Sequence, residues 1–226
     1  PLYLSASFII EEGLPLQTLA DVVKSMAEAA REAGVAIVTG DTKVVEKGHG
    51  DGLFISTTGM GEKIAGTHVS GRAAKPGDAV LVTGTMGDHG ITILSQREGL
   101  GFEAQVQSDT APLNGITEAL LAKFGDKVHV LRDPTRGGLA TTLHEIAAHS
   151  RVGIEIEEDE IPLHPAVVSA CEFLGLDPLY SAHEGKLIVI VDAEVADDAL
   201  ALIRTLKYGE NAAIIGRVTV KEPGIV

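Results

Sequence analysis

The sequence predicts an α/β or α+β protein in which helices cover the faces of sheets. Short apolar runs with the period of strands alternate along the 226 residues with runs that have the period of helices. Hydrophobic residues make up 45% of the chain, which is enough for a buried core. Aromatic residues make up only 4% and tryptophan is absent, so we expect a core of Val, Ile, Leu and Ala.

The first third of the chain predicts a strand, a helix and two further strands. Alternating apolar residues predict a strand over residues 4–11, and strands are also expected at 35–39 and 52–59. Between the first two, one apolar helical face precedes Gly34, which is expected to end the helix. That face consists of Leu16, Leu19, Val22, Val23, Met26, Ala29, Ala30 and Ala33.

A segment rich in Gly and small polar residues, 66–78, is the best candidate for a domain boundary. We therefore expect an N-terminal domain over 1–66 and a C-terminal domain over 67–226. In the latter, strands are expected at 79–83, 128–131, 152–157, 186–191 and 212–220. Helices are expected at 88–98, 111–125, 165–175 and 194–207, with another between Gly138 and His149.

The formal net charge of −14 argues against binding to nucleic acid or to anionic lipid. With so acidic a surface, a phosphate-bearing substrate is more plausibly held with the help of a metal ion than by a basic pocket. No apolar run approaches the roughly 18 residues of a membrane span, and no signal peptide is visible, so we expect a cytoplasmic protein. The single cysteine, Cys171, lies on the apolar face of a predicted helix, where a buried side chain is expected rather than a reactive thiol.

Four motifs carry candidate chemistry. The first, Val38–Lys43, places a carboxylate (Asp41), a hydroxyl (Thr42) and an ammonium group (Lys43) directly after the glycine that ends a predicted strand. Asp41 would suit a hard cation, and the other two would suit phosphate. The alternative is a simple turn, because turns routinely contain Gly and Asp.

The second motif, Thr83–Gly90, is a glycine-rich connection between a strand and a helix. It would either cradle an anion at the helix N-terminus or form an ordinary loop with Asp88 as the N-cap. It has the spacing of neither a Walker A loop nor a dinucleotide fingerprint. His89 is interpreted as a polar residue of the first helical turn.

The third and fourth motifs, Arg132–Gly138 and Tyr180–Leu187, also lie next to predicted strands. The third would meet phosphate, or would contain a structural ion pair of Asp133 with Arg132 or Arg136. In the fourth, Glu184 is a possible general base, the alternative being a solvated turn. No HExxH, Cys–His cluster or Gly-x-Ser-x-Gly sequence is present, so zincin and serine hydrolase chemistry are set aside.

The order of these motifs, preceded by FIIEEGLP at residues 8–15, resembles the HypE family of hydrogenase expression/formation proteins along essentially the whole chain. That family is related to aminoimidazole ribonucleotide synthetase, selenophosphate synthetase and thiamine-phosphate kinase. The resemblance implies an enzyme that uses ATP and Mg²⁺ to dehydrate the S-carboxamide of a C-terminal cysteine to a thiocyanate. This product would supply the cyanide ligands of nickel–iron hydrogenases.

The resemblance also implies roles for residues and partners. Lys43 matches the active-site lysine that stabilises charge, Glu184 matches the proton-accepting glutamate, and Asp41 is a candidate ligand of Mg²⁺ or nucleotide. Thr42, Asp133 and Arg136 are further candidates for nucleotide binding. The implied partners are a HypF-like carbamoyltransferase and a HypC–HypD-like complex that carries iron.

The implied fold is an N-terminal domain whose sheet forms a barrel with its twin in a homodimer, followed by a C-terminal α/β sandwich domain. The chain lacks the family's N-terminal segment and its Pro-Arg-x-Cys tail, and Cys171 cannot replace the tail cysteine, so a piece of a longer protein is expected. Two rival functions remain: a small-molecule kinase of the same superfamily, similar to thiamine-phosphate kinase, and a non-catalytic maturation scaffold.

Overall fold

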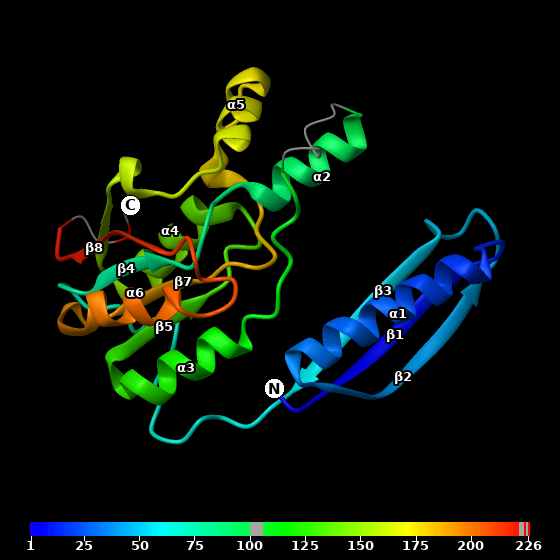
Figure 1. Ribbon diagram of the computed structural model, residues 1–226, viewed down its shortest axis with the longest axis horizontal. Coiled ribbons are helices and arrows are strands. Elements are labelled where there is room, and N and C mark those ends of the chain that lie inside the picture. The colour runs from blue at the N-terminus through cyan, green and yellow to red at the C-terminus, as the bar shows by residue number, and fades with distance from the viewer. Residues whose placement is uncertain (100–105, 222–223, 225) are drawn as a thin grey trace. The chain divides into compact units, whose positions relative to one another are not determined.

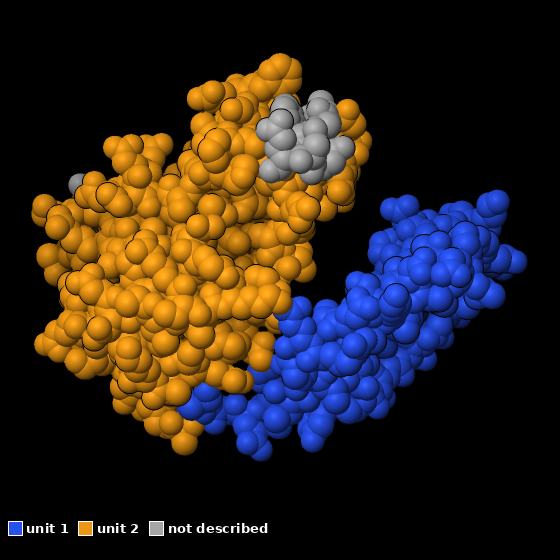
Figure 2. Space-filling model, viewed as in Figure 1, with its two compact units in different colours: residues 1–64 blue, residues 65–226 orange. Residues whose placement is uncertain are grey.

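The structure of the chain is a computed structural model that describes residues 1–99, 106–221, 224 and 226. The chain divides into two units, Pro1–Ile64 and Ala65–Val226, which Figure 2 shows in different colours. The division lies beside the Gly-rich segment 66–78 that the sequence marks as a boundary. Each unit has its own sheet, so each is described by itself.

Unit 1 is a three-stranded sheet with one long helix (Figure 1). Its elements are β1 (Tyr3–Glu11), α1 (Leu16–Ala33), β2 (Ala36–Val45) and β3 (Leu53–Met60). The strand order is β2-β1-β3, with β1 parallel to β2 and antiparallel to β3. A parallel pair needs a crossover connection, and α1 provides it. The helix ends as predicted at Gly34, whose φ of 67° is left-handed.

Strand β2 is longer than the sequence predicted. A strand was expected over 35–39, with a turn after Gly40, but the ladder with β1 continues to the pair Glu11–Val45. The polar residues that suggested a turn are kept extended because β1 lies beside them along their whole length. Gly40 allows this pairing: a Cβ built at this position would lie 1.9 Å from the carbonyl oxygen of Ala6.

Unit 2 is built on a five-stranded sheet with the order β5-β7-β4-β8-β6, in which all neighbours are antiparallel. Its strands are β4 (Ala79–Val82), β5 (Val128–Arg132), β6 (Gly153–Ile156), β7 (Ile188–Val191) and β8 (Ala213–Thr219). Its helices are α2 (Asp88–Glu98), α3 (Asn114–Phe124), α4 (Gly138–Ser150), α5 (Pro165–Leu174) and α6 (Ala196–Arg204). These elements confirm the predicted mixture of helices and sheets. Within the described ranges, no helix is both long and apolar enough to cross a membrane.

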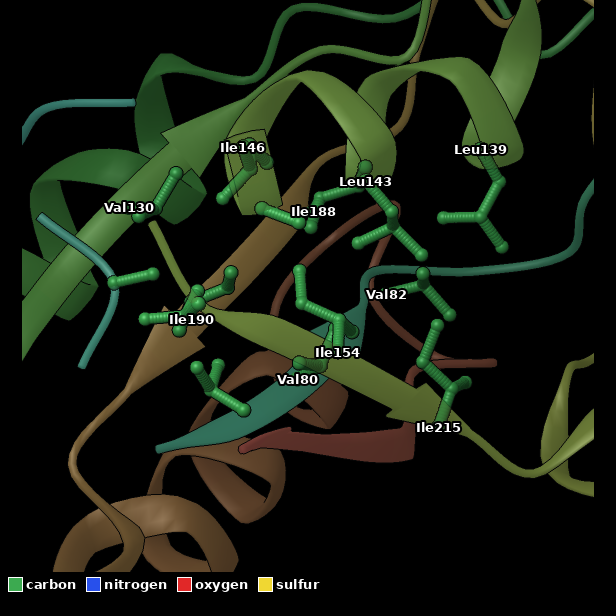
Figure 3. Packing of buried hydrophobic residues seen from close by; sticks show 14 of the residues in the cluster. Val80, Val82, Val130, Leu139, Leu143, Ile146, Ile154, Ile188, Ile190 and Ile215 are labelled. Atoms are coloured by element: carbon green, nitrogen blue, oxygen red, sulfur yellow. The ribbon is translucent and has the colours of Figure 1, made fainter. Parts of the chain in front are cut away.

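The core of unit 2 lies on both faces of this sheet. In β4, Val80 and Val82 point to one face and Ala79 and Leu81 to the other. The first face packs against Leu139, Leu143 and Ile146 of α4, and Figure 3 shows these side chains directed at the strands. The second packs against α3 and α6 through Ile116, Leu120, Ala199 and Ile203. Because both faces are covered, the central strand β4 and its neighbour β7 are continuous apolar runs. Truncating Leu143 to Ala in this core should cost about 2–5 kcal/mol.

A smaller cluster joins α2 to α5. It contains Ile91 of α2 together with Val167 and Cys171 of α5. Cys171 is only 2% exposed, which confirms its interpretation as a buried side chain. Burial, together with the charge of Asp177, raises the pKa of the thiol. The thiolate that nucleophilic chemistry needs is therefore disfavoured here.

Candidate functional site

The first motif lies within β2, and the side chains of Asp41, Thr42 and Lys43 are exposed. Its interpretation as a turn is wrong, because all three residues pair with β1. Side chains alternate along a strand, so Asp41 and Lys43 share one face of the sheet and Thr42 lies on the other. The backbone N–H of Thr42 donates to Oδ1 of Asp41 at 2.8 Å.

The face that carries Asp41 and Lys43 is rich in oxygen atoms near the carboxylate. Ser7 is the β1 partner of Asp41, and Ser56 of β3 is the next residue across the sheet. Ala6, 5% exposed, lies on the opposite face, which α1 covers (Figure 1). Exposed apolar side chains share the face of Asp41: Tyr3, Ile9, Phe54 and Met60.

The other three motifs all lie in unit 2, and the second and third contact the fourth, which contains Glu184. The N–H of Gly90 donates to the carbonyl oxygen of Ala182 at 3.1 Å. Leu187 donates its N–H to the hydroxyl of Thr83 at 2.9 Å. A Cβ on Gly138 would lie 2.4 Å from the carbonyl oxygen of Leu179. The fold therefore brings the second and third motifs, each more than 40 residues away along the chain, to one loop, residues 179–187.

Side chains of other residues occupy the space beside two glycines of the second motif. A Cβ on Gly84 would meet Cε of Lys186 at 3.1 Å, and one on Gly87 would meet Cγ1 of Val167 at 2.6 Å. These contacts favour the interpretation as a loop whose glycines permit close packing over an anion cradle. Asp88 was expected as the N-cap of α2, but the N-cap is Gly87, whose φ is 88°.

The carboxylate of Asp88 instead accepts a hydrogen bond from the hydroxyl of Thr85. His89, the next residue, has Nδ1 2.8 Å from the hydroxyl oxygen of Ser108. This agrees with its interpretation as a polar residue of the first turn of α2.

The third motif does not form either of the ion pairs considered from the sequence. Arg132 instead pairs with Glu145 of α4, with 3.3 Å between Nη2 and Oε2. Asp133 accepts a hydrogen bond from the hydroxyl of Thr135 and so closes a local turn. Among the residues that the structure describes, Arg136 is exposed and makes no salt bridge. Asp133 and Arg136 thus remain predictions as nucleotide ligands.

In the fourth motif, Glu184 has an exposed side chain on a well-anchored backbone. Its N–H donates to Oδ1 of Asp109 at 2.9 Å. The neighbouring His183 is fully buried, with Nδ1 3.4 Å from Oδ2 of Asp109. Lys186 is half-buried beside Gly84. This loop is held by specific partners, so it differs from a solvated turn.

Sequence reasoning missed Asp109 and gave no role to His183. Asp109 lies outside every predicted element, and its partners are about 75 residues further along the chain. For His183 a signal was available, since a histidine directly precedes the candidate base in the fourth motif.

Asp41 and the hydroxyl groups beside it are oxygen donors of the kind that suit a magnesium ion. No group of three or more His, Cys, Asp or Glu side chains that could hold a metal occurs in the described part of the chain. Mg²⁺ is commonly held by one or two carboxylates together with substrate phosphates. Asp41, with hydroxyl groups beside it, provides this kind of partial ligand set.

Comparison with known proteins gives matches along nearly the whole chain. The N-terminal domain family of AIR synthase related proteins matches residues 1–63, and the C-terminal domain family matches residues 75–226. Carbamoyl dehydratase HypE of Azotobacter vinelandii is 57% identical over 222 residues, which cover 98% of this chain and 65% of that protein. The chain thus spans about 65% of this relative's length.

Two solved structures are similar in both fold and sequence. Hydrogenase maturation protein HypE in complex with ATP has a TM-score of 0.95 at 54% identity, covering 100% of this chain and 69% of that one. The HypE–HypF complex has a TM-score of 0.95 at 53% identity, covering 98% of this chain and 72% of that one.

Proposed function

This chain belongs to the HypE family of AIR synthase related proteins, and from that membership we propose that the protein is an ATP-dependent carbamoyl dehydratase of hydrogenase maturation. The reaction converts a cysteine S-carboxamide to a thiocyanate, while ATP is converted to ADP and phosphate. The carboxamide oxygen leaves with the phosphate, and both protons of the amide nitrogen are lost. The thiocyanate then supplies cyanide for the nickel–iron active site.

The observation in this structure that best supports the proposal concerns Glu184. Glu184 presents an exposed carboxylate from a loop whose backbone is fixed by Asp109 on one side and by Thr83 on the other. A base that removes a proton from a bound amide must be held within hydrogen-bonding reach of that proton. A fixed backbone with an exposed carboxylate supports this role, and we assign Glu184 as the proton acceptor.

Lys43 and Asp41 are assigned to charge stabilisation. Mg-ATP supplies the phosphoryl group that turns the carboxamide oxygen into a leaving group. Asp41 would hold the magnesium ion, and Lys43, on the same face of β2, would stabilise negative charge that develops on the reacting group. Thr42, on the opposite face, and Asp133 and Arg136 in unit 2 are proposed as nucleotide contacts with a weaker structural basis.

The acceptor cysteine is proposed to lie outside residues 1–226. Cys171, the one cysteine of the sequence, is buried in the cluster between α2 and α5. A carboxamide on its sulfur would need space that Ile91 and Val167 fill. The thiol that receives the carbamoyl group is therefore another residue of the gene product.

The proposed partners follow from the family and from the surface of unit 1. The exposed apolar side chains Tyr3, Ile9, Phe54 and Met60 on one face of the sheet suit a homodimer in which two such faces meet. A HypE–HypF complex is known for a relative, so we propose a HypF-like carbamoyltransferase as the carbamoyl donor. A HypC–HypD-like complex is proposed to receive the cyanide, and the cytoplasm is proposed as the location.

Mass spectrometry of the modified cysteine tests the function. The intact gene product is incubated with its carbamoyltransferase, carbamoyl phosphate and Mg-ATP, and the peptide that bears the acceptor cysteine is weighed. We expect carbamoylation followed by loss of one water, with the water loss abolished in Lys43→Ala and in Glu184→Gln. A cysteine that is never carbamoylated would favour the small-molecule kinase. Carbamoylation without water loss would favour a scaffold.

A further inference from the structure

His183, in the loop that carries Glu184, forms a buried pair with Asp109. The side chains of His183 and Asp109 are 0% and 1% exposed. Nδ1 of His183 is 3.4 Å from Oδ2 of Asp109, and within the described chain neither atom makes a hydrogen bond, so the two groups face each other as a close polar contact. Buried polar groups of this kind are costly unless they interact, so each group depends on the other.

The two carboxylate oxygens of Asp109 have separate partners. Oδ1 accepts the backbone N–H of Glu184, at 2.9 Å, while Oδ2 faces His183. The backbone of Asp109 is also close to the loop: a Cβ on Gly185 would lie 1.7 Å from its carbonyl oxygen. Asp109 therefore contacts three consecutive residues, 183 to 185, around the candidate base.

The charge of Asp109 is maintained in spite of its burial. Burial by itself would raise the pKa of this carboxyl group, but His183, the N–H of Glu184 and the ammonium group of Lys186 together lower it below its usual value. The carboxylate is thus ionised at neutral pH, and its hydrogen bond to Glu184 is charge-assisted.

We propose that Asp109 and His183 are a positioning pair for the proton-accepting Glu184. His183 orients the carboxylate of Asp109, and Asp109 fixes the backbone from which the Glu184 side chain extends. The proposal rests on the proposed function in assigning catalysis to Glu184. The structural part, in which the pair holds the loop in place, does not depend on the proposed function.

The test uses full-length protein with a carbamoylated acceptor cysteine and follows water loss in single turnovers at varied ATP concentration. His183→Leu removes the ring nitrogen that faces Asp109, while His183→Asn keeps a polar N–H group at this position. We expect the rate at saturating ATP to fall about tenfold or more in His183→Leu, because the buried carboxylate of Asp109 then loses the polar group that faces it. The ATP concentration at half-maximal rate should be unchanged, and His183→Asn should stay within about threefold of wild type.

Asp192→Ala is a matched control. Asp192 makes the same kind of bond at the other end of β7, accepting the N–H of Glu194 at 2.9 Å. We expect its rate to equal that of wild type. If His183→Leu fails to fold, Asp109→Asn preserves the shape of the side chain and removes its charge, and it should still lower the rate. A wild-type rate in Asp109→Asn, or equal losses in both His183 variants, would overturn the proposal.

Amide hydrogen exchange separates this proposal from the proposed function, because it needs no substrate. Exchange of the Glu184 N–H should be about tenfold faster or more in Asp109→Ala than in wild type. Unchanged exchange would rule out the positioning role even if the dehydratase activity is established. If exchange is faster in Asp109→Ala but the wild-type protein has no dehydratase activity, the structural role of the pair stands and the proposed function is wrong.

Discussion

Thr83 and Leu187 are joined by two hydrogen bonds although they are 104 residues apart in sequence. Thr83 donates its N–H to the carbonyl oxygen of Leu187 at 3.1 Å, and Leu187 donates its N–H to the hydroxyl of Thr83 at 2.9 Å. Thr83 is completely buried. These bonds connect the second motif to the fourth. Thr83, at the start of the glycine-rich loop, thus fixes the backbone of Leu187 directly before β7.

The first prediction concerns this contact. Thr83→Val keeps the shape of the side chain but leaves the buried N–H of Leu187 without its acceptor. We expect a loss of about 1–3 kcal/mol in the free energy of unfolding, measured by urea denaturation. Thr205→Val is the control, because the hydroxyl of Thr205 donates to the carbonyl oxygen of Leu202 at an exposed position. The free energy of unfolding of that variant should stay within about 0.5 kcal/mol of wild type. Equal effects in the two variants would contradict the role assigned to Thr83.

The second prediction concerns Gly138, where α4 meets the loop of residues 179–187. Its φ is 64°, and a Cβ there would lie 2.4 Å from the carbonyl oxygen of Leu179. Gly138→Ala should therefore destabilise the protein by more than about 1 kcal/mol and slow water loss from the carboxamide. Gly115→Ala, on an open helical surface, should instead stabilise by up to about 1 kcal/mol. Thermal unfolding of both variants checks the contrast.

The third prediction concerns the turn between β2 and β3. The carboxylate of Glu11 accepts the N–H of Gly48 at 2.5 Å and that of Gly52 at 2.9 Å. These bonds lower the pKa of Glu11. Their stabilising effect is therefore present above the ordinary glutamate pKa of about 4.3 and is lost as the pH falls through the lower value of the folded protein.

Amide exchange measures this effect at Gly48 and Gly52. Exchange at both positions should become faster, relative to the amides of β2, in Glu11→Gln at neutral pH. Glu46→Gln offers a control in the same turn, since Glu46 is not the acceptor for either amide. Protection that survives in Glu11→Gln would show that the carboxylate does not hold the turn.

The fourth prediction concerns Cys171. Since burial and Asp177 raise the pKa of the thiol, it should not react with a thiol-specific reagent at pH 8 in the native protein and should react fully in denaturant. A folded-state pKa above the ordinary value means that any stability linked to this group is present below pH ~8.5 and decreases as the pH rises through the folded value. Rapid reaction of native protein at pH 8 would show that the cluster opens.

Much of the fold follows from local sequence pattern. Strands β4 and β7 of unit 2 are predictable because they are buried on both faces and therefore appear as short apolar runs such as LIVIV. The end of α1 is predictable because Gly34 can adopt the left-handed conformation. The extension of β2 is not, since Asp41, Thr42 and Lys43 are kept extended by pairing with β1, which no local property of these residues reveals.

The sequence predicts which residue types form the candidate site, but not the residues that hold them in place. Glycines that admit a phosphate and glycines that admit a neighbouring side chain have the same sequence signature, so the packing of Val167 against Gly87 could not be foreseen. Asp109 could not be found either, because its function depends on partners brought together only by the sheet.

The strand order of unit 2 constrains when this unit can fold during synthesis. β4 is the first of its strands to leave the ribosome and the central one in the sheet, but its neighbours β7 and β8 begin at Ile188 and Ala213. The apolar Ala79–Val82 segment must therefore remain unpaired while more than a hundred residues are translated, which takes about 5–20 s at 5–20 residues per second. Unit 1, whose three strands end at Met60, can form its hydrogen bonds within that interval. Folding yield should thus depend on chaperones that shield the nascent β4.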